Sequence, residues 1–412
     1  MILLSLLMNK EIMVELDSLF ERNARKLAQT ELKHIRYIMD EIDWKQRLIG
    51  LKGARGVGKT TLLLQRLKLL KLPANKALYV SCDNIWFSQH SIVELAETFV
   101  REGGLFLFLD EVHKYPNWAQ ELKNIYDDFP ELHTIFTGSS LLEILNARAD
   151  LSRRAIVYDM QGLSFREFLI FETEHSFPMI TINDLLINHE ERAIEICKKL
   201  RPLEHFRDYL QFGYYPFYRE SINLYPSRVE EIISMVLYIE LPLLRKLDVP
   251  YIPKIKQLLH IIAESAPFVP NVSKLSERIG INRNTFISYL FYLNEAGLTR
   301  NLYKDIKGVS RLQKPDKIYL DNPNLHYVLS SQKPNIGHVR ECFFLNQLQY
   351  NHSVEYINDG DFCADGKFTF ELGGKLKSAK QLKGASDAWI VSDSIEIGTG
   401  IRIPLWMFGF LY

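Results

Sequence analysis

Between residues 46 and 165, short apolar runs alternate with longer segments of helical pattern. The runs fall at 48–52, 77–81, 105–109, 134–137 and 155–158. The run Leu105–Leu109 contains no polar residue, which is typical of a parallel strand covered on both faces. Strands that alternate with helices in this way predict an α/β domain built on a parallel sheet.

The same patterns divide the rest of the chain. Residues 1–45 are an N-terminal helical segment, with most of the pattern over 10–45. Residues 166–250 form a helical lid beside the α/β core of 46–165. In this lid we expect a helix that begins with Phe165–Phe171 and two long helical stretches at 188–200 and 226–247. Gly213–Pro216 interrupts the helical pattern between these two stretches.

Residues 251–321 change character again. We expect helices at 255–263, 272–279 and 283–296, with a turn at Gly280–Asn282 and a stop at Gly297. Strands at 298–303 and 317–321 then surround a basic loop, and this order of elements predicts a winged helix. Residues 322–412 predict a small α/β module, with a helix near 338–350 and strands near 353–357, 367–372, 387–391 and 403–411.

Composition sets limits on the class of protein. The 412 residues carry no formal net charge, so a surface for nucleic acid must be local. The cysteines Cys82, Cys197, Cys342 and Cys363 have no metal or redox spacing, which favours free thiols in a reducing, cytoplasmic setting. The apolar start Met1–Met8 is too short to span a bilayer, and we expect a packed helix or a start at Met8 or Met13, with no membrane partner.

The first chemical signal is a complete phosphate-binding loop. It reads Gly53, Ala54, Arg55, Gly56, Val57, Gly58, Lys59 and Thr60, and Thr61 opens the helix after it. Backbone N–H groups of such a loop point at phosphate oxygens, and glycines let the backbone come close to them. Lys59 can reach the β- and γ-phosphates, and the Thr60 hydroxyl can bind Mg²⁺.

The second signal lies at the end of the apolar run 105–109. Asp110 there can hold Mg²⁺, directly or through water, and Glu111 can deprotonate an attacking water. The strand at 134–137 ends in Thr137–Ser140, and we expect it to lie between the loop strand and the acidic strand. Its tip, with Ser139 or Thr137, is a candidate sensor of the γ-phosphate. The alternative is a turn that caps the next helix at Ser139 or Ser140.

These residues resemble a family of prokaryotic AAA-type P-loop ATPases whose C-terminal region, DUF4143, contains a winged helix and a restriction-endonuclease-like module. The resemblance also rests on more particular stretches, which are Trp118, Arg154, Leu163–Phe168, Gly213–Pro216 and Lys317–Asp321. It implies ATP binding, probable hydrolysis and Mg²⁺ as cofactor. It also implies that Arg154 reaches the γ-phosphate of a neighbouring subunit in a homo-oligomer, and that Pro216 touches the base. The alternatives are a surface arginine paired with Asp150 or Asp159, and a simple helix break at Pro216.

The C-terminal segments carry two further expectations. Asn282–Thr285 opens the recognition helix, and Lys304, Lys307, Arg311, Lys314 and Lys317 lie in or near the wing, where they can contact DNA phosphates. In the last module a nuclease-like site would use Glu341, Asp361 and Glu371, with Lys375 displaced by two positions from its expected place. The displacement favours a protein-interaction platform over an efficient nuclease.

The sequence therefore predicts an ATP-hydrolysing switch that drives a winged-helix and nuclease-like arm. Two alternatives stay open at this point. One is a sensor or adaptor that holds ATP and hydrolyses it slowly or not at all, and the other is a DNA-binding nuclease that ATP regulates.

Overall fold

The computed structural model describes residues 2–138, 151–245, 247, 249–265, 267–304, 314–358, 360–377 and 387–412. The chain forms two compact units, Met1–Met160 and Gln161–Tyr412. The first unit joins the N-terminal segment to the predicted α/β core. The division of the second unit into lid, winged helix and C-terminal module stays a prediction. No helix among the described residues is long and apolar enough to cross a bilayer.

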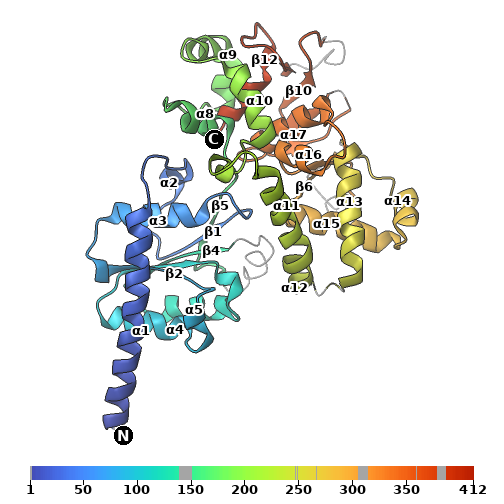
Figure 1. Cartoon of the computed structure of the whole chain (residues 1–412). Coiled ribbons are helices and arrows are strands. Elements are labelled where there is room, and N and C mark those ends of the chain that lie inside the picture. Colours follow the sequence, from blue (N-terminus) through green and yellow to red (C-terminus); the bar gives the residue numbers. More distant parts are fainter. Residues whose placement is uncertain are drawn as a thin grey trace. The chain divides into compact units, whose positions relative to one another are not determined.

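The first unit is an α/β fold with a five-stranded parallel sheet in the order β2-β3-β4-β1-β5 (Figure 1). The strands are β1 Leu48–Lys52, β2 Ala77–Ser81, β3 Phe106–Asp110, β4 His133–Gly138 and β5 Ile156–Asp159. Strand β4 pairs with both β1 and β3, so the predicted insertion of a strand between the loop strand and the acidic strand is confirmed. The carboxyl ends of β1, β3 and β4 thereby meet at one edge of the sheet.

Helices cover both faces of this sheet (Figure 1). They are α1 Ile2–Gln29, α2 Ile38–Glu41, α3 Lys59–Leu70, α4 Ile92–Arg101 and α5 Trp118–Asp128, with short 3-10 turns η1 Ala74–Lys76, η2 Ile85–Ser88 and η3 Val112–Lys114. Leu78, Val80, Leu107 and Leu109 pack with buried residues of α4 and α5 in one cluster. Helix α3 contacts β2, β3 and β4. The predicted helix over 10–45 is wrong beyond Gln29, because residues 30–37 are irregular before α2 begins.

The second unit starts with helices α8 Phe165–Thr173, α9 Ile182–Cys197 and α10 Pro202–Phe212. The 3-10 turn η4 Pro216–Arg219 follows, then α11 Tyr225–Met235, the π-helical turn η5 Val236–Glu240 and α12 Leu241–Arg245. The long helical stretch predicted over 226–247 is present over Tyr225–Arg245, as an α-helix, a π-helical turn and an α-helix in direct succession. Ser164 starts α8 with a capping box, since its hydroxyl accepts from Glu167 N–H and the Glu167 carboxylate accepts from Ser164 N–H.

The segment predicted as a winged helix contains the expected elements in the expected order. They are η6 Val249–Tyr251, α13 Ile252–Ser265, α14 Val272–Ile279, α15 Arg283–Glu295, β6 Thr299–Leu302 and β7 Lys317–Leu320. Strands β6 and β7 are antiparallel, and Phe268, between α13 and α14, bridges to Ile318 of β7. Gly280 and Gly297 have φ of 70° and 69°, which is why glycine ends α14 and follows α15.

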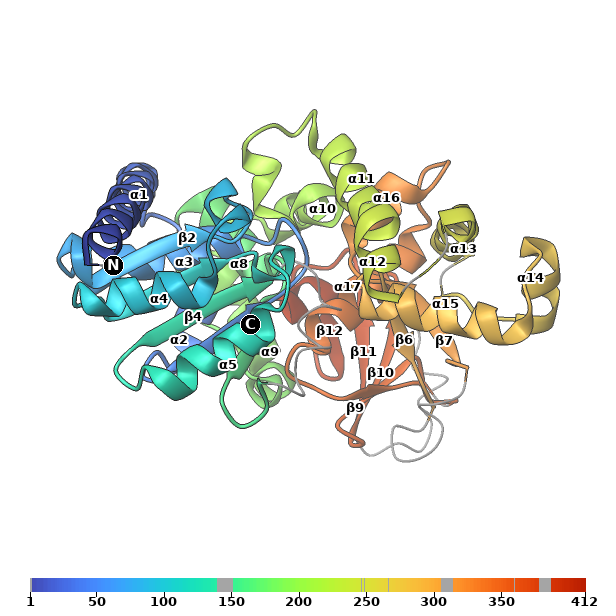
Figure 2. The same ribbon diagram turned by 90° about the horizontal axis from the view of Figure 1, so that it is seen from below.

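The end of the chain forms a second five-stranded sheet, in the order β12-β11-β10-β9-β8 (Figure 2). The strands of this sheet are β8 Val354–Glu355, β9 Phe362–Ala364, β10 Phe368–Gly373, β11 Ala388–Ser392 and β12 Arg402–Pro404. The helices α16 Pro323–Leu329 and α17 Ile336–Leu348 precede them in the chain. The strand predicted over 403–411 is wrong, because β12 ends at Pro404 and the 3-10 helix η9 Leu405–Phe410 follows. All of Leu405–Tyr412 is buried, so the side chains do not alternate between two faces as a half-buried strand requires.

Candidate nucleotide-binding site

The phosphate-binding loop has the backbone that its glycines predict. Gly56 and Gly58 have φ of 86° and 99°, a region that other residues rarely adopt. A Cβ on Gly53 would overlap the carbonyl oxygen of Met160, so only glycine fits there. Helix α3 begins at Lys59, directly after Gly58, and its first N–H groups have no partner within the helix. The loop and the helix N-terminus together form a cradle for an anion.

Lys59 lies inside this cradle. Its Nζ donates to the carbonyl oxygens of Gly53 at 2.8 Å and Ala54 at 2.9 Å. The side chain is buried. The ammonium therefore lies on the loop itself, at the place where the phosphate charge of a nucleotide would be neutralised.

Asp110, at the end of β3, is the centre of a hydroxyl network. Its Oδ2 accepts from Thr60 Oγ1 at 2.6 Å and from Tyr79 OH at 2.7 Å. Its Oδ1 accepts from Thr137 Oγ1, which in turn accepts from Glu111 N–H at 3.0 Å. Thr60 and Asp110, the two residues predicted to hold Mg²⁺, are thus in direct contact although they are 50 positions apart in the sequence.

Glu111 follows Asp110 with a backbone φ of 56°, in the left-handed region. Its Oε2 lies 2.7 Å from Nζ of Lys114, and the same ammonium lies 2.9 Å from Oδ2 of Asp83. Burial raises the pKa of Glu111, but the hydrogen bond and charge of Lys114 outweigh it, with smaller help from His113 and Arg55, and the pKa ends below its usual value. The Glu111 carboxylate is therefore ionised at neutral pH, as a general base must be.

The donor set fits the nucleotide and cation that the sequence implies. Among the described residues no cluster of three or more histidine, cysteine or acidic side chains could hold a metal. A cation bound with a nucleotide needs no such cluster, because phosphates and water supply most of its ligands. The hydroxyl of Thr60 and the carboxylate of Asp110, joined beside the loop, are the protein ligands that such an ion requires.

Several predicted residues lie elsewhere or cannot be placed. Ser139 and Ser140 lie outside the described residues, whereas Thr137 reaches Asp110. Arg154 makes two hydrogen bonds of 2.9 Å with Asp127, and Asp159 pairs with Lys52 at 2.8 Å. The predicted alternative partner Asp159 is therefore wrong, and the other alternative, Asp150, lies outside the described residues. Pro216 belongs to the second unit, where it starts η4.

Sequence reasoning missed Tyr79, Lys26 and Arg36. Arg36 is buried and donates from Nη1 to the loop carbonyl of Val57 at 2.7 Å. Lys26 of α1 donates to Tyr79 OH at 3.3 Å. Alternation along 77–81 places Tyr79 on one face with Ser81, but only the strand order brings that face to Asp110. No local signal in the sequence marks Arg36 or Lys26.

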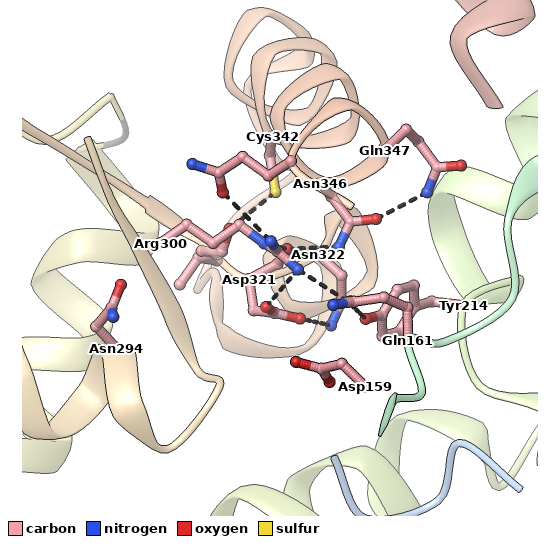
Figure 3. Close-up of polar contacts among 12 residues, drawn as sticks. Asp159, Gln161, Tyr214, Asn294, Arg300, Asp321, Asn322, Cys342, Asn346 and Gln347 are labelled. Atoms are coloured by element: carbon pink, nitrogen blue, oxygen red, sulfur yellow. Dashed lines mark hydrogen bonds and ion pairs between the residues drawn. The ribbon is translucent and has the colours of Figure 1, made fainter. Parts of the chain in front are cut away.

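Two of the stretches that carry the family resemblance, Gly213–Pro216 and Lys317–Asp321, contribute Tyr214 and Asp321 to a buried polar network of the second unit (Figure 3). Nη2 of Arg300 lies 3.0 Å from Oδ1 of Asp321 and donates to Oε1 of Gln161 at 3.1 Å. Tyr214 OH donates to the same Gln161 oxygen at 3.2 Å, and Asn346 Nδ2 donates to the Asp321 carbonyl at 2.9 Å. Gln161, Tyr214 and Asp321 thus have an architectural role in this network.

The C-terminal module departs from the predicted nuclease-like arrangement. The lysine that pairs with Glu371 is Lys377, because β10 ends at Gly373 and Lys375 is not on the strand. A Cβ on Gly373 would overlap the side-chain carbons of Lys377, which lies across this glycine. Asp361 Oδ2 accepts from Leu372 N–H at 2.8 Å. Glu341 accepts from Tyr319 OH at 2.9 Å, and burial with the charge of Asp361 raises its pKa.

The strand order, the loop and the acidic strand define an AAA-type P-loop ATPase domain. Residues 45–169 match a family model described as an AAA domain, and residues 203–335 match a domain of unknown function, DUF8612. The matched C-terminal family thus differs from DUF4143, which the resemblance implied.

Individual proteins are also similar to this chain. An uncharacterised protein of Methanocaldococcus jannaschii, MJ1637, is 27% identical over 394 residues, covering 87% of this chain and 82% of that protein. A Walker-type ATPase of Pyrococcus abyssi is 14% identical, covering 75% of this chain and 95% of that one, with a TM-score of 0.40. AMPPCP-bound DnaA from Aquifex aeolicus is 17% identical, with coverage of 63% and 84% and a TM-score of 0.25.

Proposed function

We propose that the protein binds Mg·ATP and hydrolyses it to ADP and phosphate, and that it acts as a molecular switch. The observation that carries the proposal is the 2.6 Å hydrogen bond from Thr60 Oγ1 to Asp110 Oδ2. It joins the end of the phosphate-binding loop to the end of the acidic strand. A chance glycine-rich turn has no reason to place its hydroxyl on a buried carboxylate.

Each residue has a role that follows from its position. The backbone of Gly53–Thr61 and the ammonium of Lys59 bind the phosphates, and Thr60 with Asp110 holds the cation. When bound, Mg²⁺ neutralises charge on the β- and γ-phosphates. Glu111 accepts the proton of the attacking water, and Lys114 keeps it ionised until then. Ser139 senses the γ-phosphate, and Arg154 completes the site of a neighbouring copy in a homo-oligomer.

The switch role draws support from the short connection between the units. Met160 N–H donates to the carbonyl of Lys52 at 2.7 Å, and its own carbonyl lies against Gly53 of the loop. The next residue, Gln161, is held in the second unit by Arg300 and Tyr214. Met160 and Gln161 are neighbours in the chain, so this short segment connects the phosphate-binding loop to the buried network of Figure 3 along the sequence. A change in the loop on hydrolysis can therefore bias the second unit through this segment.

Steady-state ATP turnover tests the proposal, measured with and without DNA, RNA and cell extract. Lys59→Ala is the matched control for the site, and Arg201→Ala is a control on the exposed surface of the second unit. Mg²⁺-dependent turnover that Lys59→Ala abolishes supports the ATPase. Binding of ATP without turnover under every condition favours the alternative of an ATP sensor or adaptor.

We also propose that the winged helix binds nucleic acid, because the start of α15 is solvent-exposed. Asn282, Arg283 and Asn284 are exposed, and Asn282 caps the helix by accepting from Thr285 N–H at 2.8 Å. Of the basic residues around the wing, Lys304 is exposed, while Lys314 donates to the carbonyl of Pro270 and Lys317 lies over the Tyr356 ring. Lys307 and Arg311 lie outside the described residues.

Duplex DNA binding over a series of salt concentrations tests this second proposal. Affinity should fall steeply with salt, and Arg283→Glu should reduce the slope by about one phosphate contact. Arg201→Glu is the matched control, since it makes the same charge change at an exposed residue that precedes α10, outside the segment predicted as a winged helix. Binding that ignores salt, Arg283→Glu and the double change Lys307→Glu/Arg311→Glu removes this surface from consideration.

For the C-terminal module we propose a protein-interaction platform on a nuclease-like arrangement. The observation behind it is the pairing of Glu371 with Lys377 across Gly373, which leaves the acidic residue already engaged. The test is a Mg²⁺ and Mn²⁺ titration with plasmid and single-stranded DNA. Cleavage that Asp361→Ala and Glu371→Ala abolish would instead favour a DNA-binding nuclease regulated by ATP.

A further inference from the structure

The hydroxyl of Tyr79 holds the carboxylate that ends the acidic strand. It donates to Asp110 Oδ2 at 2.7 Å, next to the bond from Thr60 Oγ1 to the same oxygen. The strand register explains the contact. Ser81 pairs with Asp110 and Tyr79 with Phe108, so Tyr79 and Asp110 project on the same face of neighbouring strands. The sequence alone gives Tyr79 no role.

The surroundings of Tyr79 make this hydrogen bond strong and permanent. The residue is 4% exposed, so water competes little for the hydrogen bond of its hydroxyl. Burial, with the charge and hydrogen bond of Asp110, raises the pKa of Tyr79 far above its usual value. The phenol is therefore protonated at neutral pH and donates the hydrogen bond to Asp110.

The two donors on Asp110 Oδ2 differ in what they can do. The Thr60 hydroxyl can keep its bond to Asp110 when its oxygen binds a cation, because that oxygen also has lone pairs. Tyr79 belongs to β2 and not to the loop, and we assign it no contact with the cation. Its bond persists and fixes the rotamer of Asp110.

The N-terminal helix joins this arrangement through Lys26. Its Nζ donates to Tyr79 OH at 3.3 Å and lies 4.6 Å from the centre of the Tyr79 ring. A hydroxyl that accepts from an ammonium is a stronger donor to a carboxylate. Helix α1, which sequence analysis treated as a separate segment, thereby reaches the nucleotide site.

We infer that Tyr79 is a positioning residue of the cation site, that it holds Asp110 in the orientation which binds Mg²⁺ beside the nucleotide, and that Lys26 supports it. The inference rests on the proposed function, since it assumes that Mg·ATP binds at the loop. We assign Tyr79 no contact with the nucleotide or with the attacking water. Its effect acts on the cation requirement through Asp110.

Tyr79→Phe tests the inference, because it keeps the ring in the core and removes only the hydroxyl. In the full chain we measure the Mg²⁺ concentration for half-maximal ATP turnover, and nucleotide affinity both with Mg²⁺ and in EDTA. The half-saturating Mg²⁺ concentration should rise about tenfold to 150-fold, the usual effect of losing a hydrogen bond to a charged group. Affinity in EDTA should stay within about twofold of the wild type, as the loop is untouched.

Tyr158→Phe is the matched control. Tyr158 lies on β5 of the same sheet, and its hydroxyl accepts from Asp43 N–H at 2.9 Å, away from Asp110. It should leave the Mg²⁺ requirement unchanged. Lys26→Met should raise the requirement by about twofold to fivefold, since it weakens the Tyr79 hydroxyl and leaves it in place.

The outcomes separate the inference from the proposed function. A wild-type protein without Mg²⁺-dependent nucleotide binding contradicts the proposed function itself. The inference alone is overturned if the wild-type protein binds Mg·ATP and the half-saturating Mg²⁺ concentration of Tyr79→Phe is equal to or lower than that of the wild type. Equal losses of affinity with Mg²⁺ and in EDTA also overturn it, because they indicate a purely structural role. No shift in Lys26→Met removes α1 from the arrangement.

Discussion

The ammonium of Lys114 lies 2.7 Å from the carboxylate of Glu111, three residues earlier in the chain. The same ammonium bridges to Asp83, beyond the end of β2. Glu111 is therefore paired before any nucleotide arrives. The pair lowers the pKa of Glu111, so the carboxylate is ionised at neutral pH and can accept a proton. The contact with Lys114 also restrains the orientation of the Glu111 side chain.

Replacing Lys114 should move the pH dependence of hydrolysis. Lys114 lowers the pKa of Glu111, so Lys114→Met should raise it, because burial then acts without its main opposing charge. A base works only when deprotonated, and activity falls as pH drops through its pKa. The acid limb of the kcat profile should therefore shift to higher pH in Lys114→Met. Asp83→Asn leaves the Lys114–Glu111 pair in place and serves as control. An unmoved acid limb in Lys114→Met contradicts the role of Glu111 as the titrating base.

Binding and chemistry should separate at Lys59 and Glu111. Lys59→Ala removes the only ammonium that lies on the loop among the described residues, and it should abolish ATP binding. Glu111→Gln keeps the shape of the side chain and loses the base, so ATP should bind and turnover should stop. Equilibrium binding of a fluorescent ATP analogue and phosphate release measure the two steps. Turnover of Glu111→Gln at the wild-type rate shows that another group is the base.

Local sequence signals predicted the parts of this site that are contiguous in the chain. Gly53–Thr60, the run ending in Asp110 and the five strands of the first sheet each carry their pattern within ten residues. Tyr79 and Arg36 were missed because their contacts depend on strand order and on the packing of an irregular segment. No period of hydrophobic residues encodes either.

Two errors in the C-terminal module have a similar physical cause. A continuous apolar run fits a buried strand or a buried helix equally well, so 403–411 could not be assigned by its period. Lys375, which we expected two positions late in the nuclease-like site, is not on the strand, because β10 ends at Gly373. Beyond that glycine the chain turns back, and Lys377 reaches Glu371 instead.

The two hydrogen bonds between Arg154 and Asp127 give a sharper test of an arginine acting between subunits. If Arg154 serves a neighbouring copy, Arg154→Ala should bind ATP normally and lose turnover by about 10³-fold or more. Asp127→Asn weakens the pair within the subunit and keeps the arginine, so its turnover should persist. Mixing Lys59→Ala subunits with Arg154→Ala subunits should restore activity, since the first supplies Arg154 to the intact loop of the second. A monomeric, fully active wild-type enzyme excludes this role.

Breaking the buried pair of Arg300 and Asp321 should strongly destabilise the second unit. Their side chains are only 13% and 10% exposed, so each charge depends on the other. Arg300→Met leaves the Asp321 carboxylate without its partner and should destabilise the unit by about 3–5 kcal/mol. The measurement is urea unfolding, following the transition that ATP does not shift. Arg201→Met removes an exposed cation and should change stability by less than about 0.5 kcal/mol. Equal effects of the two variants would show that the network of Figure 3 carries no stability.

Removing residues 403–412 should unfold the second unit and leave the nucleotide site intact. Leu405–Phe410 and Tyr412 are all buried, and burial of each large apolar side chain contributes about 1.5–3 kcal/mol. The backbone oxygen of Tyr412 also accepts from Ser164 Oγ and Arg166 Nε, each at 2.9 Å, so the segment holds the start of α8 in place. The total is comparable to the usual net stability of a domain, about 5–15 kcal/mol. Because the first unit is compact by itself, the truncated protein should still bind ATP in a manner that Lys59→Ala abolishes.

Trp406→Ala is a milder change in the same segment, and it should lower the free energy of unfolding of the second unit by about 3–5 kcal/mol. Ile397→Ala, at an exposed side chain, is its control. Circular dichroism and nucleotide binding on the same samples decide the matter: loss of ATP binding together with the second unit would show that the two units do not fold independently.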